Sequence, residues 1–184
     1  IGAIPILVDI EPVHFTMDVQ DLKKKLTKKS RAIMPVHAFG CSVDMDPILE
    51  VGNELKLPVI EDAACAFGTL YKGQYCGTMG FAGCYSFHPR KAITTGEGGM
   101  IVTNDDLLAQ RIQLLRNHGG VRKELYLEFV EAGYNYRLSD IQGAMGIAQM
   151  EKAQMLIEER RVRAEQLREK LKPFSQINLP YAPS

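Results

Sequence analysis

The sequence has no tryptophan and carries no excess of charge, and both facts limit what it can do. Its 184 residues include 22 lysines plus arginines and 22 aspartates plus glutamates, so the formal net charge is zero. A balanced charge favours neither nucleic acid nor an anionic membrane as a partner. No apolar run approaches the roughly 20 residues that a membrane helix needs, and no signal peptide is visible. The composition, 46% hydrophobic, predicts a globular domain with a sizeable core.

Cysteine is also scarce, and its spacing argues against a zinc site. The four cysteines, Cys41, Cys65, Cys76 and Cys84, form no Cys-x-x-Cys pair, and no histidine stands at zinc-ligand spacing from them. This pattern favours reduced, partly buried thiols in a cytoplasmic protein. The glycine-rich segment 96–99 matches neither the Walker loop nor the dinucleotide fingerprint, so nucleotide binding by those motifs is not expected.

The first half of the sequence alternates apolar runs with helical patterns. Residues 4–10, 32–36 and 57–60 predict three strands, and the first has the pattern of a strand covered on both faces. One helix is predicted at about 18–27, and another begins at Asp46 as its N-cap. This order predicts an α/β fold with a mainly parallel sheet and helices on both faces. Ligands of such sheets bind at the carboxyl ends of the strands.

The second half combines long loops with strongly helical sequence. Residues 68–83 and 118–138 are predicted to be irregular, and a loop of the second length is usually functional. Between them, Thr103 or Asn104 is predicted to cap a helix. Ser139 opens a capping box, and charged, helical sequence continues from there towards the C-terminus.

One lysine stands out by its setting. A short strand, residues 84–87, ends at His88-Pro89, where proline stops strand pairing. Lys91 follows, and then come three glycines within four residues, which accept positive φ and favour a tight turn. Lysines are mostly solvated surface charges, but one held between a strand end and such a turn is positioned. We interpret Lys91 as a candidate to form a Schiff base with pyridoxal phosphate.

Other polar residues near strand ends have both a structural and a functional interpretation. Asp62 could cap the next turn, or its carboxylate could pair with a pyridinium nitrogen and keep the ring electron-withdrawing. Ser86 could bond to a neighbouring strand or donate to a phosphate oxygen. Asn135 could fix its own loop or reach the site of a neighbouring subunit.

Taken together, the chain resembles the DegT/DnrJ/EryC1/StrS family of pyridoxal-phosphate-dependent sugar aminotransferases. The matching segments follow the family's order across residues 2–150. They are Gly2-Ala3-Ile4-Pro5 with Val8-Asp9; Pro35-Val36-His37 with Gly40; Asp44-Met45-Asp46; Glu61-Asp62-Ala63-Ala64; Tyr71-Lys72-Gly73; Ser86-Phe87-His88-Pro89 with Lys91; Gly96-Glu97-Gly98-Gly99; Arg116-Asn117-His118-Gly119; and Gly133-Tyr134-Asn135-Tyr136-Arg137 with Ile141-Gln142.

The resemblance implies a set of roles. Lys91 would hold the cofactor aldehyde as a Schiff base and act as the catalytic residue. Asp62 would pair with the ring nitrogen, Ser86 would contact the phosphate, and Asn135 would contact the phosphate in the partner's site of a homodimer. Many family members have glutamine where Cys65 stands, and that glutamine contacts the cofactor ring or its phenolic oxygen. Cysteine cannot make the same hydrogen bond well.

The resemblance also implies the architecture and the reaction. The fold would be the aspartate-aminotransferase-like (type I) large domain, incomplete here, with residues 1–150 forming most of it. Residues 151–172 would form a long connecting helix, and residues 173–184 would begin a missing smaller C-terminal domain. The reaction would move an amino group from glutamate to a keto sugar, which is expected to be nucleotide-linked. The chain by itself is expected to be inactive.

Two alternatives compete with this prediction. Some relatives are pyridoxal-phosphate sugar dehydratases in which histidine replaces the lysine, and Lys91 argues against that chemistry. A non-catalytic, cofactor-binding regulator is the other, and the presence of Lys91, Asp62 and Ser86 together argues against it.

Overall fold

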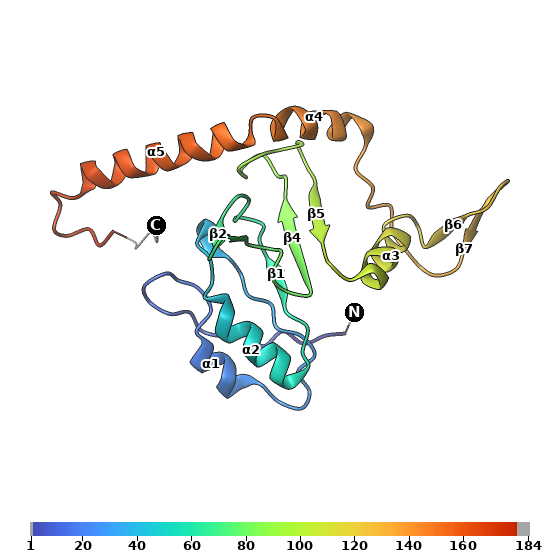
Figure 1. The fold of residues 1–184 in the computed structure, drawn as a ribbon, viewed down its shortest axis with the longest axis horizontal. Coiled ribbons are helices and arrows are strands. Elements are labelled where there is room, and N and C mark those ends of the chain that lie inside the picture. Colours follow the sequence, from blue (N-terminus) through green and yellow to red (C-terminus); the bar gives the residue numbers. More distant parts are fainter. Residues whose placement is uncertain (1, 180–184) are drawn as a thin grey trace.

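The computed structural model describes residues 2–179, which form a small mixed sheet flanked by helices (Figure 1). In chain order the elements are α1 (Val19–Lys25), the 3-10 turn η1 (Ala38–Gly40), α2 (Met45–Leu55), β1 (Ile60–Asp62), β2 (Leu70–Tyr71), β3 (Gln74–Tyr75), β4 (Ala82–Ser86), β5 (Gly99–Val102), α3 (Asp106–Leu115), β6 (Gly120–Arg122), β7 (Leu127–Phe129), α4 (Asp140–Met150) and α5 (Ala153–Leu171).

The central sheet has the strand order β1-β4-β5. Strands β1 and β4 are parallel, and β4 and β5 are antiparallel. Single parallel bridges from Ile33 to Val59 and from Val36 to Asp62 place segment 32–36 alongside β1. The α/β class predicted from the sequence is therefore confirmed, with a sheet that is partly parallel. Segment 32–36 makes isolated bridges rather than the regular strand that was predicted.

The main hydrophobic core lies between this sheet and helices α1 and α2. The buried members are Leu22, Ile33, Val43, Met45, Ile48, Val51 and Val59. A second, smaller cluster joins Phe87 and Ile93 to Ala153 at the start of α5. The second cluster matters for function because it ties the loop after β4 to the C-terminal helices.

The strand predicted at residues 4–10 is wrong. This segment forms no strand beyond a single bridge from Ile10 to Met17, and Ile4 and Leu7 are 83% and 84% exposed. Of its side chains, Val8 packs against the core. Helix α1 contacts the segment mainly through hydrogen bonds: the Asp9 amide donates to Asp21 at 2.7 Å, and Lys25 Nζ donates to the Leu7 carbonyl at 2.9 Å. An apolar run indicates a tendency to be buried, but burial needs a partner surface that the run itself does not supply.

Two predicted helix caps are wrong because tertiary contacts engage the side chains. The N-cap of α2 is Asp44, not Asp46. The Asp44 carboxylate accepts the Tyr71 hydroxyl at 2.6 Å, and Asp46 pairs with Lys72. The N-cap of α3 is Asp105, whose carboxylate accepts the Leu108 amide, and not Thr103 or Asn104. The Thr103 hydroxyl donates instead to the Phe81 carbonyl at 2.7 Å.

Both segments predicted to be irregular contain β-hairpins. Strands β2 and β3 pair around the turn at Lys72 and Gly73, whose φ angles are both positive. Strands β6 and β7 pair in the same antiparallel manner, and their hairpin projects from the body of the molecule (Figure 1). Strands of two or three residues are too short to show the alternation by which a strand is recognised in a sequence.

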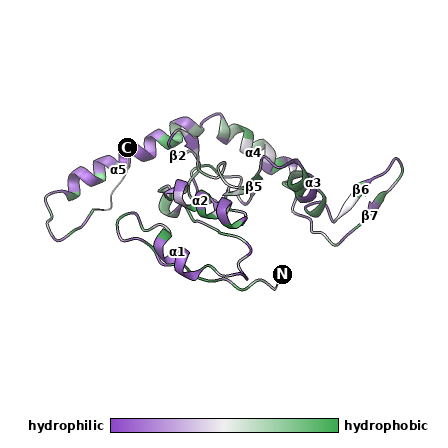
Figure 2. Ribbon diagram, turned by 60° about the horizontal axis from the view of Figure 1, so that its bottom comes forward, coloured by the Kyte–Doolittle hydropathy of each residue, from purple (hydrophilic) through white to green (hydrophobic). Residues whose placement is uncertain are grey.

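Helices α4 and α5 run across one side of the molecule as a nearly continuous rod (Figure 1). The predicted capping box at Ser139 is confirmed, with Gln142 as its second member. Only the start of α5 is packed: Ala153 is buried, whereas Leu167 is 57% exposed. Most of α5 is hydrophilic (Figure 2). Among the described residues, no helix is both long and apolar enough to cross a membrane.

Candidate functional site

The carboxyl ends of β1 and β4 bring together the residues singled out in the sequence. Asp62 is the last residue of β1 and Ser86 is the last residue of β4. Because the two strands are parallel and Asp62 pairs with Cys84, both ends lie at the same edge of the sheet. Lys91 follows on the loop after β4. All three side chains are partly exposed, so a small molecule could reach them.

The Lys91 amine points to the loop that follows β1. Its Nζ lies 3.1 Å from Cys65 Sγ, and Cys65 is exposed. The backbone of Lys91 is fixed by its amide, which donates to the His88 carbonyl at 2.9 Å. The turn beyond it needs glycine at position 96, where φ is +81°. The structure thus brings the side chains of Lys91 and Cys65 into contact.

Asp62 and Ser86 each make one local contact and keep capacity for another. Asp62 Oδ1 accepts the Ala64 amide at 3.0 Å, which confirms the structural interpretation of this residue. Within residues 2–179 no donor is recorded for Asp62 Oδ2. Ser86 Oγ accepts the His88 amide at 3.3 Å, so its own hydroxyl hydrogen can be donated elsewhere. A carboxylate and a hydroxyl donor therefore lie at the sheet edge from which the Lys91 loop begins.

Polar side chains from α4 and α5 hold the backbone of the Lys91 loop. Gln142 Nε2 donates to the Glu97 carbonyl at 2.9 Å, and Gln149 Oε1 accepts the Thr94 amide at 3.2 Å. Arg160 donates from its guanidinium to the carbonyl of Lys91 itself at 2.9 Å. In the sequence, Arg160 is one of many charged residues in the helical stretch after Ser139, and nothing distinguishes it. For the two glutamines, the sequence does contain one indication: they are seven residues apart, which places both on one face of α4.

Replacing Arg160 with alanine should loosen the Lys91 loop without unfolding the protein. Loss of one hydrogen bond from a charged, exposed donor corresponds to about 1 kcal/mol. Hydrogen exchange at the Lys91 loop amides should therefore rise roughly five-fold. Arg161→Ala, which alters an adjacent exposed charge on α5, is the matched control. Equal exchange rates in the two variants would contradict a positioning role for Arg160.

Glu61, the residue before Asp62, is fully buried, and its carboxylate binds the backbone of the loop between β3 and β4. Glu61 Oε2 lies 3.0 Å from His37 Nε2 and accepts the Gly77 amide at 2.6 Å. Glu61 Oε1 accepts the amides of Met79 and Gly80 at 2.7 and 2.6 Å. Nothing in the sequence indicates this pairing, because the two residues are 24 positions apart. These four contacts fix the end of β1, from which Asp62 projects.

The protonation of the His37–Glu61 pair follows from the surrounding donors. Burial raises the pKa of the Glu61 carboxyl, but the hydrogen bonds from His37 and from three backbone amides outweigh it, and the net shift is downward. For His37, burial lowers the pKa of the imidazole, but Cys76 and Glu61 outweigh it and raise the pKa to about 9. That charge would require a proton on Nδ1, which already faces the amide hydrogen of Val43. His37 Nδ1 accepts the Val43 amide at 3.1 Å, and an imidazolium has no lone pair with which to accept. We therefore assign a neutral imidazole that donates from Nε2 to an ionised Glu61.

Asn135 is the one predicted site residue that the structure does not bring to Lys91. It is exposed on the segment between β7 and α4 and makes an isolated antiparallel bridge with Asn117. No hydrogen bond recorded in the described part of the chain joins it to Lys91, Asp62 or Ser86. Its predicted role in a partner's site stays a prediction.

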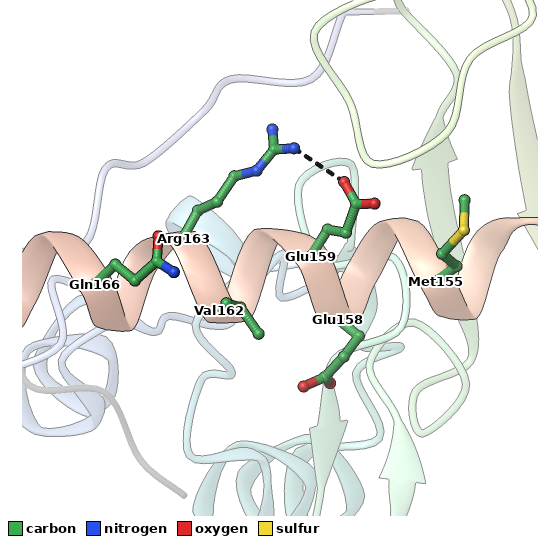
Figure 3. A pocket seen from close by; sticks show the side chains of 6 residues that line it. All are labelled: Met155, Glu158, Glu159, Val162, Arg163 and Gln166. Atoms are coloured by element: carbon green, nitrogen blue, oxygen red, sulfur yellow. Dashed lines mark hydrogen bonds and ion pairs between the residues drawn. The ribbon is translucent and has the colours of Figure 1, made fainter.

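A surface hollow on the outer side of α5 is separate from this site. It has a volume of about 370 Å³ and is lined by Met155, Glu158, Glu159, Val162, Arg163 and Gln166. All six come from α5, and Figure 3 shows them spread along the helix with Arg163 bonded to Glu159 at 3.0 Å. A hollow formed by one helix surface lacks the converging polar groups of a binding site.

Comparison with solved structures defines the class of protein. The fold matches that of PseC from Helicobacter pylori, an aminotransferase in pseudoaminic acid biosynthesis, with a TM-score of 0.90 and 32% identity over 93% of this chain and 46% of that chain. It also matches the PLP form of Spr1654 from Streptococcus pneumoniae, with a TM-score of 0.86 and 26% identity over 93% of this chain and 49% of that chain. The chain therefore has the fold of part of the large domain of such enzymes.

Sequence comparison identifies the family. Residues 1–183 match the DegT/DnrJ/EryC1/StrS aminotransferase family, and the chain belongs to it. GDP-perosamine synthase from Caulobacter vibrioides is 49% identical over 151 residues, which are 82% of this chain and 40% of that protein. The chain thus spans about half the length, or less, of the relatives it matches. The family resemblance predicted from the sequence motifs is confirmed.

The residues present fit pyridoxal phosphate, the cofactor that this family implies. Lys91 supplies a primary amine in reach of the strand ends. Asp62 has a carboxylate oxygen available for a protonated ring nitrogen, and Ser86 has a hydroxyl hydrogen available for a phosphate oxygen.

Proposed function

We propose that this chain forms most of the cofactor-binding domain of a pyridoxal-phosphate-dependent aminotransferase that acts on a keto sugar. The observation that carries the proposal is the convergence of Lys91, Asp62 and Ser86 at the carboxyl ends of two parallel strands. Membership of the family supports it. We further propose glutamate as the amino donor and a nucleotide-linked sugar as the acceptor. The name of the similar GDP-perosamine synthase supports a GDP-linked acceptor.

In this proposal the residues of the chain divide the work around the cofactor. Lys91 attaches the cofactor as a Schiff base, Asp62 pairs with its ring nitrogen, and Ser86 binds its phosphate. When bound, pyridoxal phosphate supplies an electron-withdrawing ring that stabilises negative charge on the substrate carbon. The thiol of Cys65 lies beside the Lys91 amine. Cys65 stands where a glutamine is common in the family.

The Lys91 amine is the base that moves the proton. Its Nζ would hold the cofactor until an amino substrate binds, and would then be the group that takes a proton from the substrate carbon and gives it up again. The Asp62 carboxylate would pair with the ring nitrogen. The contacts of Arg160 and Gln149 with the loop backbone hold Nζ in place during both steps. A positioned base of this kind contributes about 10²–10⁴ to the rate.

We also propose a homodimer in which Asn135 completes the partner's phosphate site. Tyr134 and Tyr136 stack beside it with ring centroids 5.1 Å apart, and they are 68% and 73% exposed. On the projecting hairpin, Leu125 and Phe129 are 94% and 66% exposed. Large exposed apolar and aromatic side chains in one region are typical of a protein interface. These exposed rings support the proposal that Asn135 faces a second copy.

The two halves of the proposed reaction can be separated in the full-length protein loaded with pyridoxal phosphate. Glutamate alone should yield one 2-oxoglutarate per active site and then stop. Adding a GDP-linked keto sugar should restore turnover, with a UDP-linked keto sugar as the matched control. An absence of 2-oxoglutarate under both conditions would contradict glutamate as the donor.

A further inference from the structure

Cys65 contacts the Lys91 amine, and the proposed reaction has no role for that thiol–amine contact. The thiol Sγ and the amine Nζ are 3.1 Å apart, and they come from the loops after β1 and β4. Cys65 is exposed, and Lys91 is partly exposed, so small solutes can reach both atoms. A thiol in contact with a lysine amine has a nucleophile beside it as soon as the sulfur becomes oxidised.

The other three cysteines are in less reactive surroundings. Cys76 is fully buried. Cys41 and Cys84 are partly buried, and burial raises the pKa of both thiols, which lowers their thiolate fraction. No hydrogen bond or ion pair recorded in residues 2–179 joins any of these three sulfurs to a lysine amine. Oxidation should therefore begin at Cys65.

We propose that Cys65 and Lys91 become covalently joined when the cofactor-free protein meets hydrogen peroxide. In the first step peroxide converts the thiol of Cys65 to a sulfenic acid and releases water. In the second step the unprotonated Lys91 amine attacks the sulfur, the S–O bond breaks, an S–N bond forms, and a second water leaves. The product is a sulfenamide, in which the sulfur carries the oxidation and the pair has lost two hydrogens. Two equivalents of a thiol reverse it and leave a disulfide of that thiol.

The position of the pair favours this product over further oxidation. Sulfenic acids condense with a nitrogen or thiol nucleophile when one is close, and otherwise proceed to sulfinic acid. Here the amine is already in contact with the sulfur, and Arg160 holds the Lys91 backbone. Closure requires only a small movement of two flexible side chains.

The consequence for catalysis rests on the proposed function of Lys91. A lysine in the S–N bond cannot attach pyridoxal phosphate, and a lysine attached to the cofactor cannot attack sulfur. Peroxide would then inactivate the cofactor-free protein reversibly and spare the loaded one. The pair would make cofactor loading sensitive to the redox state of the surroundings.

Peptide mapping of the full-length protein tests the pair directly. Cofactor-free protein is treated with limiting hydrogen peroxide, digested without reductant, and analysed by mass spectrometry. The expected result is a peptide containing Cys65 joined to one containing Lys91, lighter by two hydrogens than their sum, and lost on treatment with dithiothreitol. Sulfinic acid at Cys65 with an unmodified Lys91, or a disulfide from Cys65 to another cysteine, would overturn the proposal.

Two variants and one addition sharpen the test. In Lys91→Arg the guanidinium does not attack sulfur, so sulfenic acid should persist at Cys65 and react with dimedone several-fold more than in the unaltered protein. In Cys84→Ser the cross-link should form as before. Equal dimedone labelling with and without Lys91 would overturn the pairing. Pyridoxal phosphate added first should prevent the cross-link. A cross-link that forms despite the cofactor would support the pair and contradict the proposed attachment to Lys91.

Discussion

Replacing Lys91 with alanine in the full-length protein is expected to abolish transamination. Loss of the positioned base alone costs about 10²–10⁴ in kcat, and loss of the attachment point removes the covalent hold on the cofactor as well. The expected kcat therefore lies below detection in a coupled assay of 2-oxoglutarate. The effect should appear in kcat, because the substrate contacts made by other residues are unchanged.

Two controls separate the roles of the Lys91 amine. Lys91→Arg keeps a positive charge but offers no amine that can lose a proton at neutral pH, so it should be as inactive as the alanine variant. A small primary amine added to Lys91→Ala should restore part of the proton transfer, because it supplies the missing base. Turnover in either variant within ten-fold of the unaltered protein would rule out Lys91 as the catalytic residue.

Replacing Glu61 with glutamine is expected to have the largest effect on stability. The amide can still accept at one oxygen, but its NH₂ group would face the Gly77 amide and His37 Nε2, both of which donate to Glu61 now. His37 cannot reverse its tautomer, because Nδ1 accepts the Val43 amide. With the Gly77 amide and His37 Nε2 each facing a donor instead of an acceptor, the free energy of unfolding should fall by about 3 kcal/mol in total.

Hydrogen exchange gives a local measure of that loss. The amides of Gly77, Met79 and Gly80 donate to Glu61, and their protection should fall in Glu61→Gln by the factor that corresponds to about 3 kcal/mol, roughly 100-fold. Glu50→Gln, on the exposed side of α2, is the matched control. Unchanged protection in Glu61→Gln would show that the carboxylate does not hold this loop.

The same pair predicts how stability changes with acidity. Burial opposes ionisation of Glu61, but the hydrogen bonds from His37 and three amides dominate and lower its pKa in the folded state. A lowered folded pKa means that the contribution of Glu61 is complete above the pKa of the unfolded state and is lost as pH falls through the folded pKa. The stability difference between the unaltered protein and Glu61→Gln should therefore be constant near neutrality and shrink in acid. A difference that grows on acidification would contradict the assignment.

Much of the site could be predicted because its features are local in the sequence. Asp62 stands at the end of β1 and Ser86 at the end of β4. Both positions could be predicted, because the apolar run of each strand stops at a polar residue. The setting of Lys91 follows from the proline before it and the glycines after it. The capping box at Ser139 is likewise a local pattern, and the structure confirms it.

The features that escaped prediction depend on partners far away in the sequence. The contact of Arg160 with Lys91 spans 69 residues, and that of His37 with Glu61 spans 24. No spacing rule connects such residues, because the fold alone decides which turn of α5 meets the loop. Segment 4–10 shows the reverse case: its apolar residues predicted burial, but Val8 packs against the core while Ile4 and Leu7 stay exposed.

Reductive trapping tests the central claim most directly. The full-length protein is incubated with pyridoxal phosphate, reduced with borohydride and digested, and the modified peptide is sequenced by mass spectrometry. The account predicts a single pyridoxyl group on Lys91, and none after Lys91→Arg. A pyridoxyl group on a different lysine, or unchanged labelling in Lys91→Arg, would contradict it.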